Sequence, residues 1–363
     1  MRVLKQISIR NFKSIREQTL ALGSLNVFIG GNGAGKSNLI EVFRFLREIV
    51  TENLRGYTMQ KGGADSLLYF GRKRSPTLTF RLEFGEGSIS NTYRVDLQGT
   101  DDGELIIASE KAYYHEKHRY PRPFELSVSS YAKESTLKHQ SHICARQVMF
   151  DLGGYRVYHF HDTSDTAAMK GKCDVDDNRF LRPQAENLAA FLYWLQEKAP
   201  DHLANIQGTV RQIAPFIDRF QLSPSRLNES KIGLEWVEKG NDAYFNASSL
   251  SDGTLRFICL ATLLLQPELP ATLLLDEPEL GLHPAAISLL AALLDSASTR
   301  TQVIVATQSV TLVNQFAPDK VWVVDRHDQQ SVFRHLSNED MSTWLEDYAL
   351  GELWEKNILG ARP

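Results

Sequence analysis

The stretch Gly30–Ser37, GGNGAGKS, constrains the fold of this chain more than any other feature. It fits the pattern G-x-x-x-x-G-K-[ST] and lies between a short apolar run, LNVFIG, and a segment with helical spacing of apolar residues, NLIEVFRFLREIV. Glycines there allow a tight turn whose backbone N–H groups, with the helix N-terminus, face a polyphosphate. The stretch therefore predicts a phosphate-binding loop, the alternative being a Gly-rich turn that only caps a helix.

The residues of this loop have distinct expected roles. Lys36 is expected to hold the β- and γ-phosphates, and Ser37 to offer its hydroxyl to Mg²⁺. The other residues of the loop that we predict to bind nucleotide are Gly30, Asn32, Gly33, Ala34, Gly35 and Asn38.

Two acids at the end of another apolar run support this site. Asp276 and Glu277 follow TLLL, and open α/β sheets bind their ligands where strands end. Because adjacent residues of a strand point to different faces, Asp276 is expected to reach Mg²⁺ while Glu277 acts as general base on the attacking water. Without a phosphate loop, two solvated acids in a loop would be the better interpretation.

The pattern along the chain predicts an α/β fold. Short alternating runs separated by Gly-rich turns, over 77–108, predict antiparallel strands. Strands alternate with helices in the last third, which predicts a largely parallel sheet covered on both faces, with the N-terminal strand–helix unit as its other half. Residues 111–146 show no regular period and are interpreted as an insertion, followed by two helices at 185–200 and 201–217. We divide this single head, 1–363, into a first lobe 1–110, an insertion and helical region 111–219, and a second lobe 220–363.

Composition limits the class of protein. Hydrophobic residues make up 42% and charged residues 23%, which is ordinary for a soluble globular protein. No apolar stretch approaches the length of a membrane span, and we expect a cytoplasmic protein with no membrane partner. The three dispersed cysteines argue against a disulfide framework. A net charge of −4 argues against a wholly basic nucleic-acid coat but permits a local basic patch.

Four motifs in order, GxxxxGKS, LSDGT, DEPELGLHP and ATQS, resemble those of ABC-type ATPases of the SMC and RecF branch. The opening ISIRNFKSI resembles the first strand of that branch, and the ending YALGELWEKNILGARP resembles the tail of its short predicted ATPases, many of which come from phage-defence operons. The likeness covers roughly 1–50 and 248–325. It implies an α/β, ABC/SMC-type P-loop NTPase head with mixed and largely parallel sheets and an inserted β-rich and helical region. It also implies ATP and Mg²⁺ as cofactors and Asn11, Phe12 and Lys13 as further nucleotide-binding residues.

The resemblance gives LSDGT, residues 250–254, an unusual role. Ser251, Asp252 and Gly253 would complete the nucleotide site of a partner chain, whereas the stretch by itself is simply a good helix N-cap. Asp252 replaces the usual glycine and would make the loop less favourable for phosphate. Gln308 of ATQS, which we predict to be catalytic with Lys36 and Glu277, replaces the usual histidine; it can donate a hydrogen bond but carries no charge, so slow turnover is expected.

These features predict an ATP-hydrolysing switch. ATP would close a head-to-tail homodimer or higher homo-oligomer, and the change would control a nucleic-acid-linked or effector-linked process such as anti-phage defence or DNA repair. The alternative is a nucleotide-stabilised, non-catalytic scaffold for a partner effector protein: Gln308 favours the scaffold, and Lys36, Asp276 and Glu277 favour the enzyme. A transporter ATPase is a third interpretation, which ISIRNFKSI disfavours.

Three stretches are candidates for contacts with partners or ligands. The basic, tyrosine-rich residues 111–146 could bind DNA or RNA. The aromatic tail 341–359 could bind an effector protein, for example a nuclease, although docking on its own core is the favoured alternative. YHFHDTSD, residues 158–165, could line the nucleotide site or an inter-lobe contact. The glutamine loop of the family is left open among Gln60, Gln140 and Gln147.

Overall fold

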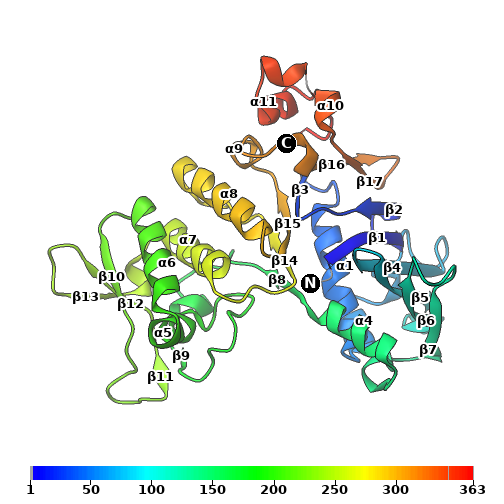
Figure 1. Cartoon of the computed structure of the whole chain (residues 1–363), viewed down its shortest axis with the longest axis horizontal. Helices are drawn as coiled ribbons and strands as arrows, with labels where there is room; N and C mark the ends of the chain where they lie inside the picture. Colours follow the sequence, from blue (N-terminus) through cyan, green and yellow to red (C-terminus); the bar gives the residue numbers. More distant parts are fainter. Residues whose placement is uncertain (1–2, 342, 363) are drawn as a thin grey trace.

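The computed structural model describes residues 3–341 and 343–362, and Ser342 of the aromatic tail lies outside them. Two six-stranded sheets dominate the fold (Figure 1). The first sheet is antiparallel, in the order β2-β1-β4-β5-β6-β7, and its strands are β1 (Val3–Phe12), β2 (Ile15–Ala21), β4 (Thr77–Glu86), β5 (Ile89–Gly99), β6 (Leu105–Glu116) and β7 (Phe124–Ala132). The second has the order β17-β16-β3-β15-β14-β8, and its strands are β3 (Leu25–Ile29), β8 (Tyr155–Tyr158), β14 (Thr272–Asp276), β15 (Gln302–Thr307), β16 (Val321–His327) and β17 (Gln330–His335).

The second sheet joins the two ends of the chain. The N-terminal strand β3 pairs in parallel with β15 on one side and β16 on the other, and only the edge strand β17 is antiparallel to its neighbour. Every residue of β3 and β15 is buried, as expected for parallel strands covered on both faces. The prediction that the two α/β segments are halves of one sheet is confirmed.

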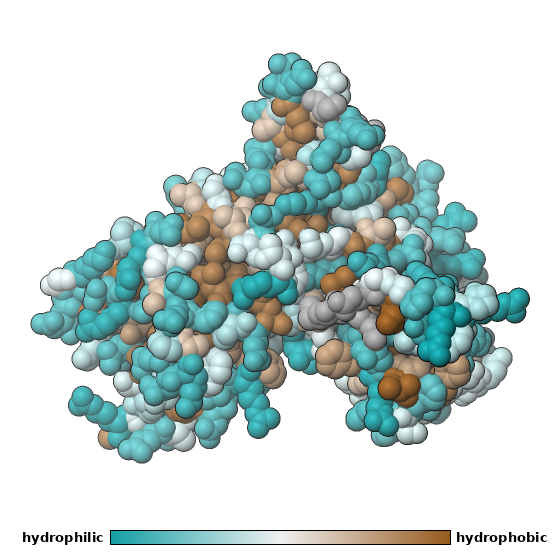
Figure 2. Space-filling model, in the orientation of Figure 1, coloured by the Kyte–Doolittle hydropathy of each residue, from teal (hydrophilic) through white to brown (hydrophobic). Residues whose placement is uncertain are grey.

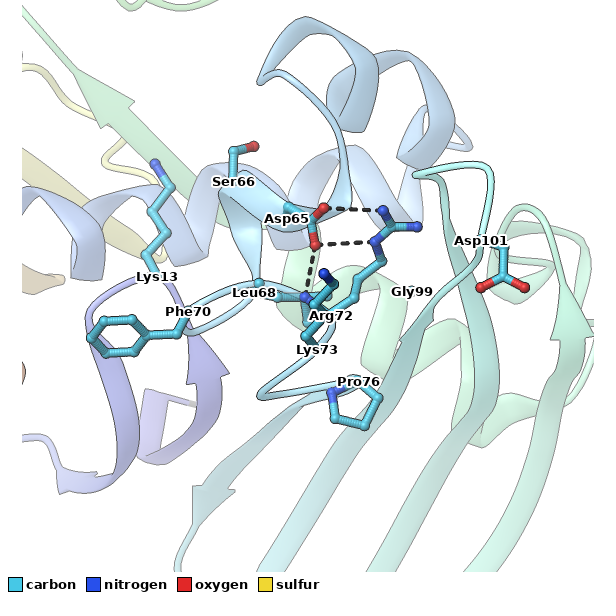
Figure 3. Close-up of a pocket in the computed structure, with 11 residues that line it drawn as sticks. Lys13, Asp65, Ser66, Leu68, Phe70, Arg72, Lys73, Pro76, Gly99 and Asp101 are labelled. Carbon is cyan, nitrogen blue, oxygen red and sulfur yellow. Dashed lines mark hydrogen bonds and ion pairs between the residues drawn. The ribbon is translucent and has the colours of Figure 1, made fainter.

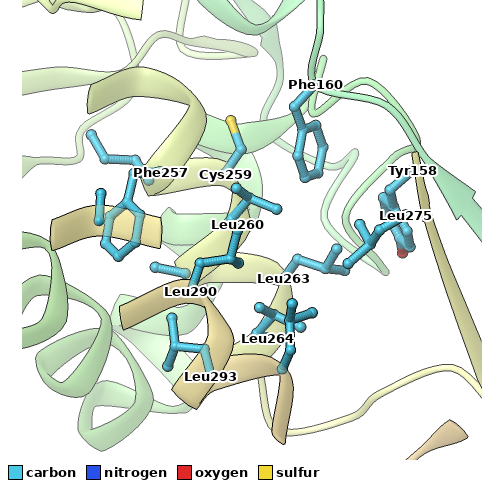
Figure 4. Close-up of a cluster of buried hydrophobic side chains, with 14 of the residues drawn as sticks. Tyr158, Phe160, Phe257, Cys259, Leu260, Leu263, Leu264, Leu275, Leu290 and Leu293 are labelled. Atoms are coloured by element: carbon cyan, nitrogen blue, oxygen red, sulfur yellow. The ribbon is translucent and has the colours of Figure 1, made fainter. Parts of the chain in front are cut away.

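This sheet separates two hydrophobic cores. Alternate residues of β3 point to opposite faces: Val27 and Ile29 enter one core and Phe28 the other. Helices α7 (Asp252–Leu265) and α8 (Pro284–Ser298) cover the first face, where Leu260 and Leu290 belong to the packed cluster of Figure 4. Helix α1 (Lys36–Val50) covers the second face. Helices α1 and α7 therefore lie on opposite sides of the sheet (Figure 1).

A lobe of helices and short strands extends from α7. The two predicted helices are confirmed as α5 (Leu188–Lys198) and α6 (Pro200–Ile213). Its short strands are β9 (Cys173–Asp174), β10 (Ile217–Gln221), β11 (Lys231–Ile232), β12 (Glu235–Glu238) and β13 (Tyr244–Asn246). The remaining helices of the chain are α2 (Leu54–Gln60), α3 (Ala64–Leu67), α4 (Ile143–Gly153), α9 (Val310–Val313), α10 (Asn338–Met341) and α11 (Leu350–Glu355).

Residues 111–146 differ from the prediction of a separate insertion. They continue the antiparallel sheet as the second half of β6 and the whole of β7, and then enter α4. The pairing register shifts between Glu110 and Lys111, and β7 is an edge strand with a largely exposed surface. A register shift and an exposed edge both erase the alternation of apolar and polar residues on which the sequence prediction depends. The division points 110/111 and 219/220 both fall inside strands, β6 and β10.

The face of the molecule seen in Figure 2 is mostly hydrophilic, with a notch between the α5–α6 lobe and the lobe of β4–β7. Within residues 3–341 and 343–362, no helix has the length and apolar character needed to cross a membrane.

Candidate nucleotide site

The predicted phosphate loop runs from the end of β3 to the first residue of α1. Gly35 has a left-handed backbone, with φ of 117°, and a Cβ atom there would overlap the Ser331 hydroxyl. Glycine is therefore required at this position both for conformation and for space. Asn32, Gly33 and Ser37 are exposed, so the loop presents its backbone and the Ser37 hydroxyl to solvent.

Lys36 is folded back into the loop. Its side chain is only 5% exposed, and its ammonium donates to the carbonyl oxygens of Gly30 at 2.5 Å and Gly31 at 3.1 Å. Burial lowers the pKa of Lys36, and the nearby carboxylates, Glu277 first, act in the opposite direction. A desolvated cation beneath an exposed glycine loop is suited to compensate phosphate charge.

The two predicted acids follow β14, but the reason for their divergence differs from the prediction. The strand ends at Asp276, and Glu277 has a left-handed backbone with φ of 44°, fixed by its N–H bond to the Ala306 oxygen at 2.8 Å. A turn, rather than extended alternation, thus separates the two side chains. Burial raises the pKa of Asp276, and the charge of Glu277 raises it further. Burial disfavours the charged form of this carboxylate, and a bound cation would offset that cost.

Gln308 contacts the general-base candidate directly. Its side-chain amide donates to the Glu277 carboxylate, a contact that the sequence prediction of a phosphate-facing Gln308 did not include. Next to it, the Thr307 hydroxyl donates to Glu279, whose side chain is 8% exposed and whose second carboxylate oxygen has no hydrogen-bond partner among the described residues. Burial raises the pKa of Glu279. The ends of β14 and β15 are therefore tied together by two side-chain pairs.

The loop after β8 also reaches this site, because β8 is the neighbour of β14. The His161 imidazole is bonded through Nε2 to the Asp276 carbonyl oxygen at 2.7 Å. The His159 imidazole contacts the Arg44 guanidinium of α1, and burial, followed by the charge of Arg44, lowers the pKa of His159 to about 4. The same loop also accepts hydrogen bonds from Arg256 of α7 at the Phe160 and His161 carbonyl oxygens, so both roles left open for residues 158–165 stay open.

Two glutamines proposed for the family's glutamine loop have other partners. The Gln140 amide contacts Val128 at 3.5 Å, and the Gln147 amide donates to Asp151 at 3.2 Å. Gln60 is exposed at the last position of α2. His159 and His161, which follow the strand next to β14, lie near Asp276 instead. The family pattern has a glutamine in this role and therefore does not point to histidines.

The three residues Asn11, Phe12 and Lys13, predicted to bind nucleotide, have different surroundings in the structure. Phe12 is fully buried and packs against Phe45 and Phe80, so its ring is occupied by the core, and its predicted contact with nucleotide stays a prediction. The Asn11 amide donates to the Thr77 carbonyl oxygen at 2.9 Å and thereby joins two strands. The side chain of Lys13 pairs with Glu41 on α1. Burial would raise the pKa of Glu41, but hydrogen bonds from Lys13 and Lys61 lower it.

A cavity of about 790 Å³ lies beside Lys13 (Figure 3). Phe70 on its wall is 46% exposed, and the Arg74 guanidinium lies 4.5 Å from the centre of its ring. Arg72 on the same wall is paired with Asp65, whereas Lys73 and Asp101 add one charge of each sign. The residues that line the cavity do not include Gly30–Ser37; the link to the loop is indirect, because Ser14, next to Lys13, accepts a hydrogen bond at 2.7 Å from Asn38, which follows Ser37. An exposed aromatic ring with nearby cations suits a base and sugar. The wall residues Phe70, Arg72 and Lys73 belong to the stretch YFGRKR, residues 69–74. This stretch has aromatic and basic residues but no helical or strand period, so the sequence patterns did not single it out.

The stretch LSDGT, residues 250–254, which we call the signature loop, lies at the N-terminus of α7. The Ser251 hydroxyl accepts the Thr254 N–H at 3.2 Å, which confirms the N-cap. A Cβ on Gly253 would lie 2.6 Å from the Gly281 oxygen, so this glycine is needed for packing within its own chain. Asp252 lies 3.6 Å from the Lys170 ammonium, which reduces the repulsion of phosphate expected from the sequence. The stretch is on the other side of the sheet from α1.

The chain is similar to several known proteins. The model of the family described as "AAA domain, putative AbiEii toxin, Type IV TA system" matches residues 25–314. Structural maintenance of chromosomes protein 3 of Arabidopsis thaliana is 27% identical over 172 residues, covering 43% of this chain and 14% of that protein. The DNA replication and repair protein RecF of Bacteroides thetaiotaomicron is 27% identical over 153 residues, covering 36% of this chain and 40% of RecF. The matched regions thus span less than half of either relative.

Solved structures resemble almost the whole chain. An Smc head bound to the C-terminal winged-helix domain of ScpA has a TM-score of 0.63 at 16% identity and covers 94% of this chain and 99% of that chain. An Smc head with an extended coiled coil, bound to the C-terminal domain of ScpA derived from Pyrococcus furiosus, has a TM-score of 0.61 at 15% identity, with 96% and 99% covered. At such identities the likeness concerns the fold, and it confirms the predicted ABC/SMC-type P-loop NTPase head.

Proposed function

The chain belongs to the family of AAA domains described as putative AbiEii toxins of type IV toxin–antitoxin systems, and we propose that it is an ATP-hydrolysing switch that works as a head-to-tail homodimer or higher homo-oligomer. The observation that carries this proposal is that Lys36, which follows β3, and the acids Asp276 and Glu277, which follow β14, lie at one edge of the same sheet with β15 between the two strands. Strands β3, β15 and β14 lie side by side in parallel, so the residues that follow them share one edge. ATP and Mg²⁺ as ligands also fit the predicted cytoplasmic location.

The donor set suits magnesium nucleotide. Ser37 and Asp276 are the residues that would hold Mg²⁺, a hard cation that prefers oxygen ligands and would neutralise charge developing on the transferred phosphoryl group. Lys36 compensates charge at the phosphate end, and the exposed N–H groups of the glycine loop donate to phosphate oxygens. Glu277 accepts the proton of the attacking water. Gln308 keeps the Glu277 carboxylate oriented, and the missing charge at position 308 supports slow turnover.

The separation of α1 and α7 supports a site shared between two chains. Both helices present exposed polar residues at their N-termini, Ser37 on α1 and Ser251 at the start of α7, yet the sheet lies between them. In a head-to-tail pair, Ser251 and Gly253 of one chain would face the phosphate loop of the other. The positive end of α7 would then point at the anion.

Mixing two inactive variants tests the shared site. Lys36→Ala inactivates the phosphate loop, and Ser251→Arg inactivates the signature loop. A mixed dimer therefore keeps one site that combines an intact phosphate loop from one chain with an intact signature loop from the other. If chains exchange freely and sites act independently, a one-to-one mixture should recover about a quarter of wild-type ATP turnover, because about half the dimers are mixed and each has one good site of two.

Energy transfer between donor-labelled Lys36→Ala chains and acceptor-labelled Ser251→Arg chains measures the efficiency of exchange. A thermal melt of Ser251→Arg is required, since loss of the N-cap costs about 1 kcal/mol. A mixture that exchanges chains and stays as inactive as either parent would contradict the shared site.

We further propose that the cavity beside Lys13 receives the adenosine part of ATP, with Phe70 stacking on the base. Phe70→Ala should then raise the Kd for ATP by about tenfold, because stacking of a base on an aromatic side chain contributes roughly 1–3 kcal/mol. The measurement is fluorescence titration with a labelled ATP analogue. Phe150→Ala, which removes a 71% exposed phenylalanine on α4, is the matched control and should leave Kd unchanged. Equal affinities of both variants would exclude Phe70 from the site.

The non-catalytic scaffold stays as a second candidate, because the Gln308 amide occupies an oxygen of Glu277. Quench-flow under single-turnover conditions separates the two: hydrolysis on the enzyme at a measurable rate supports the switch, and stable bound ATP supports the scaffold.

The process that is controlled is also a proposal. In the basic stretch 111–146, Lys111 pairs with Glu125 at 2.7 Å, Lys117 with Glu83 at 3.3 Å, and His139 with Glu52 at 2.7 Å. Such pairing weakens the case for DNA or RNA binding there, so we favour an effector protein, for example a nuclease, as the partner. A role in anti-phage defence agrees with the toxin–antitoxin description of the family. The RecF match supports DNA repair as the alternative.

A further inference from the structure

The C-terminal segment of the chain reaches the phosphate loop. A Cβ on Gly31 would lie 2.7 Å from the Arg362 carbonyl oxygen, and the two nearest atoms around that position both belong to Arg362. Gly31 is not among the residues with positive φ, so its backbone accepts any L-residue and only this carbonyl restricts the space. The contact therefore explains a glycine that the phosphate-loop pattern does not require.

The end of this segment is firmly anchored. The Trp354 indole, which is fully buried, donates to the Ala361 carbonyl oxygen at 2.6 Å, and the Ala361 N–H donates to the Asp325 carboxylate at 3.2 Å. The Arg334 guanidinium donates to the Leu359 carbonyl oxygen at 2.5 Å. Ala361 has a left-handed backbone, φ of 52°, which is uncommon for alanine and persists where surrounding contacts fix it. Leu353 and Trp354 of the aromatic tail are thus buried in the chain's own core, whereas Trp344 and Leu345 are 43% and 37% exposed.

The start of the same segment packs on the helix that follows Gln308. Helix α11 packs on α9, the helix that begins two residues after Gln308. The Gly351 N–H donates to the Asn314 side chain at 2.6 Å, just beyond the end of α9. One short segment therefore contacts the phosphate loop at one end and the helix behind Gln308 at the other.

We propose that residues 350–362, here called the C-terminal brace, position the phosphate loop relative to the Gln308 loop and thereby set the affinity for nucleotide. This role depends on the proposed ATP site. The brace acts through Gly31 from outside the loop, while the Ser331 hydroxyl supports the loop from β17 through the Ala34 carbonyl oxygen at 2.5 Å. A loop that is held in its binding conformation loses less conformational entropy when it binds, which increases affinity.

The test is a double-mutant cycle on nucleotide affinity. One variant lacks residues 361–363, a second carries Gly31→Ala, and the third combines both. Removal of the brace end should raise the Kd for a labelled ADP analogue about tenfold, and Gly31→Ala should do the same by pushing the Arg362 carbonyl away. In the shortened chain, Gly31→Ala should cost nothing more, because nothing is left for the added methyl group to displace.

Different results of this cycle would contradict the role of the C-terminal brace and the proposed function. An unchanged Kd after removal of residues 361–363, or losses that multiply to about 100-fold in the combined variant, would overturn the brace while leaving the ATP site standing. Wild-type protein that binds no nucleotide would overturn the proposed function instead. Glu355→Ala, at an exposed position of α11, is the control for a change that leaves the brace contacts in place. Melting temperatures with and without nucleotide show whether a variant has lost binding or merely stability.

Discussion

Lys36→Ala is expected to weaken ATP binding by about 10- to 100-fold, because a charge-assisted contact with phosphate contributes roughly 1.5–3 kcal/mol and each 1.4 kcal/mol corresponds to a factor of ten. The buried ammonium is the cation closest to the phosphate loop, bonded to Gly30 and Gly31 in the structure. Isothermal titration calorimetry with ATP and Mg²⁺ measures the effect.

The control for Lys36→Ala is Lys198→Ala, which removes an exposed lysine from the last turn of α5. It should bind ATP as the wild type does. If Lys36→Ala also binds ATP with wild-type affinity, the assignment of Gly30–Ser37 as the phosphate site is wrong.

Glu277→Gln should bind ATP normally but lower the hydrolysis rate by about 100- to 10,000-fold, the usual contribution of a general base. The amide keeps one oxygen that can accept the Gln308 hydrogen bond, so the local geometry is retained. With hydrolysis blocked, the ATP-bound closed dimer should accumulate, since a ligand that binds only the dimer stabilises it. Stopped-flow phosphate release and light scattering provide the two measurements.

Glu229→Gln, at an exposed turn far from the site in sequence, is the matched control and should hydrolyse ATP at the wild-type rate. Two results would contradict the expected mechanism. Undiminished turnover in Glu277→Gln would exclude this residue as the base, and an identical mass with and without ATP would exclude dimerisation driven by ATP.

The local sequence patterns predicted most of the elements around the site. Three features could be predicted because each depends on residue types and spacings within about ten positions: the loop Gly30–Ser37, the strand ending at Asp276 and the N-cap Ser251. A single sequence is enough to recognise such local patterns. The predictions failed where local pattern was weak: the edge strand β7 is largely exposed, and the register shift at Glu110 interrupts the alternation of β6.

Contacts between distant residues could not be predicted in the same way. Phe12 was expected at the nucleotide but lies in the core against Phe80, and Asp252 was expected to repel phosphate but pairs with Lys170. The apolar strands β3, β14, β15 and β16 carry little information about which of them are neighbours, since one buried run of Val, Leu and Ile resembles another. Only the assembled sheet decides which side chains meet.

The sequence by itself determined which chemical groups the candidate site has available: a lysine, a serine and two acids that follow strands, together with a glycine-rich loop. Tertiary structure decided how that chemistry is arranged. It placed Gln308 on Glu277 and His161 on the Asp276 carbonyl oxygen, and it brought Arg362 against Gly31 across more than 300 positions of the chain. The physical reason is that side-chain type sets what a residue can bind, whereas the order of strands in the parallel sheet sets which residues lie within reach of one another.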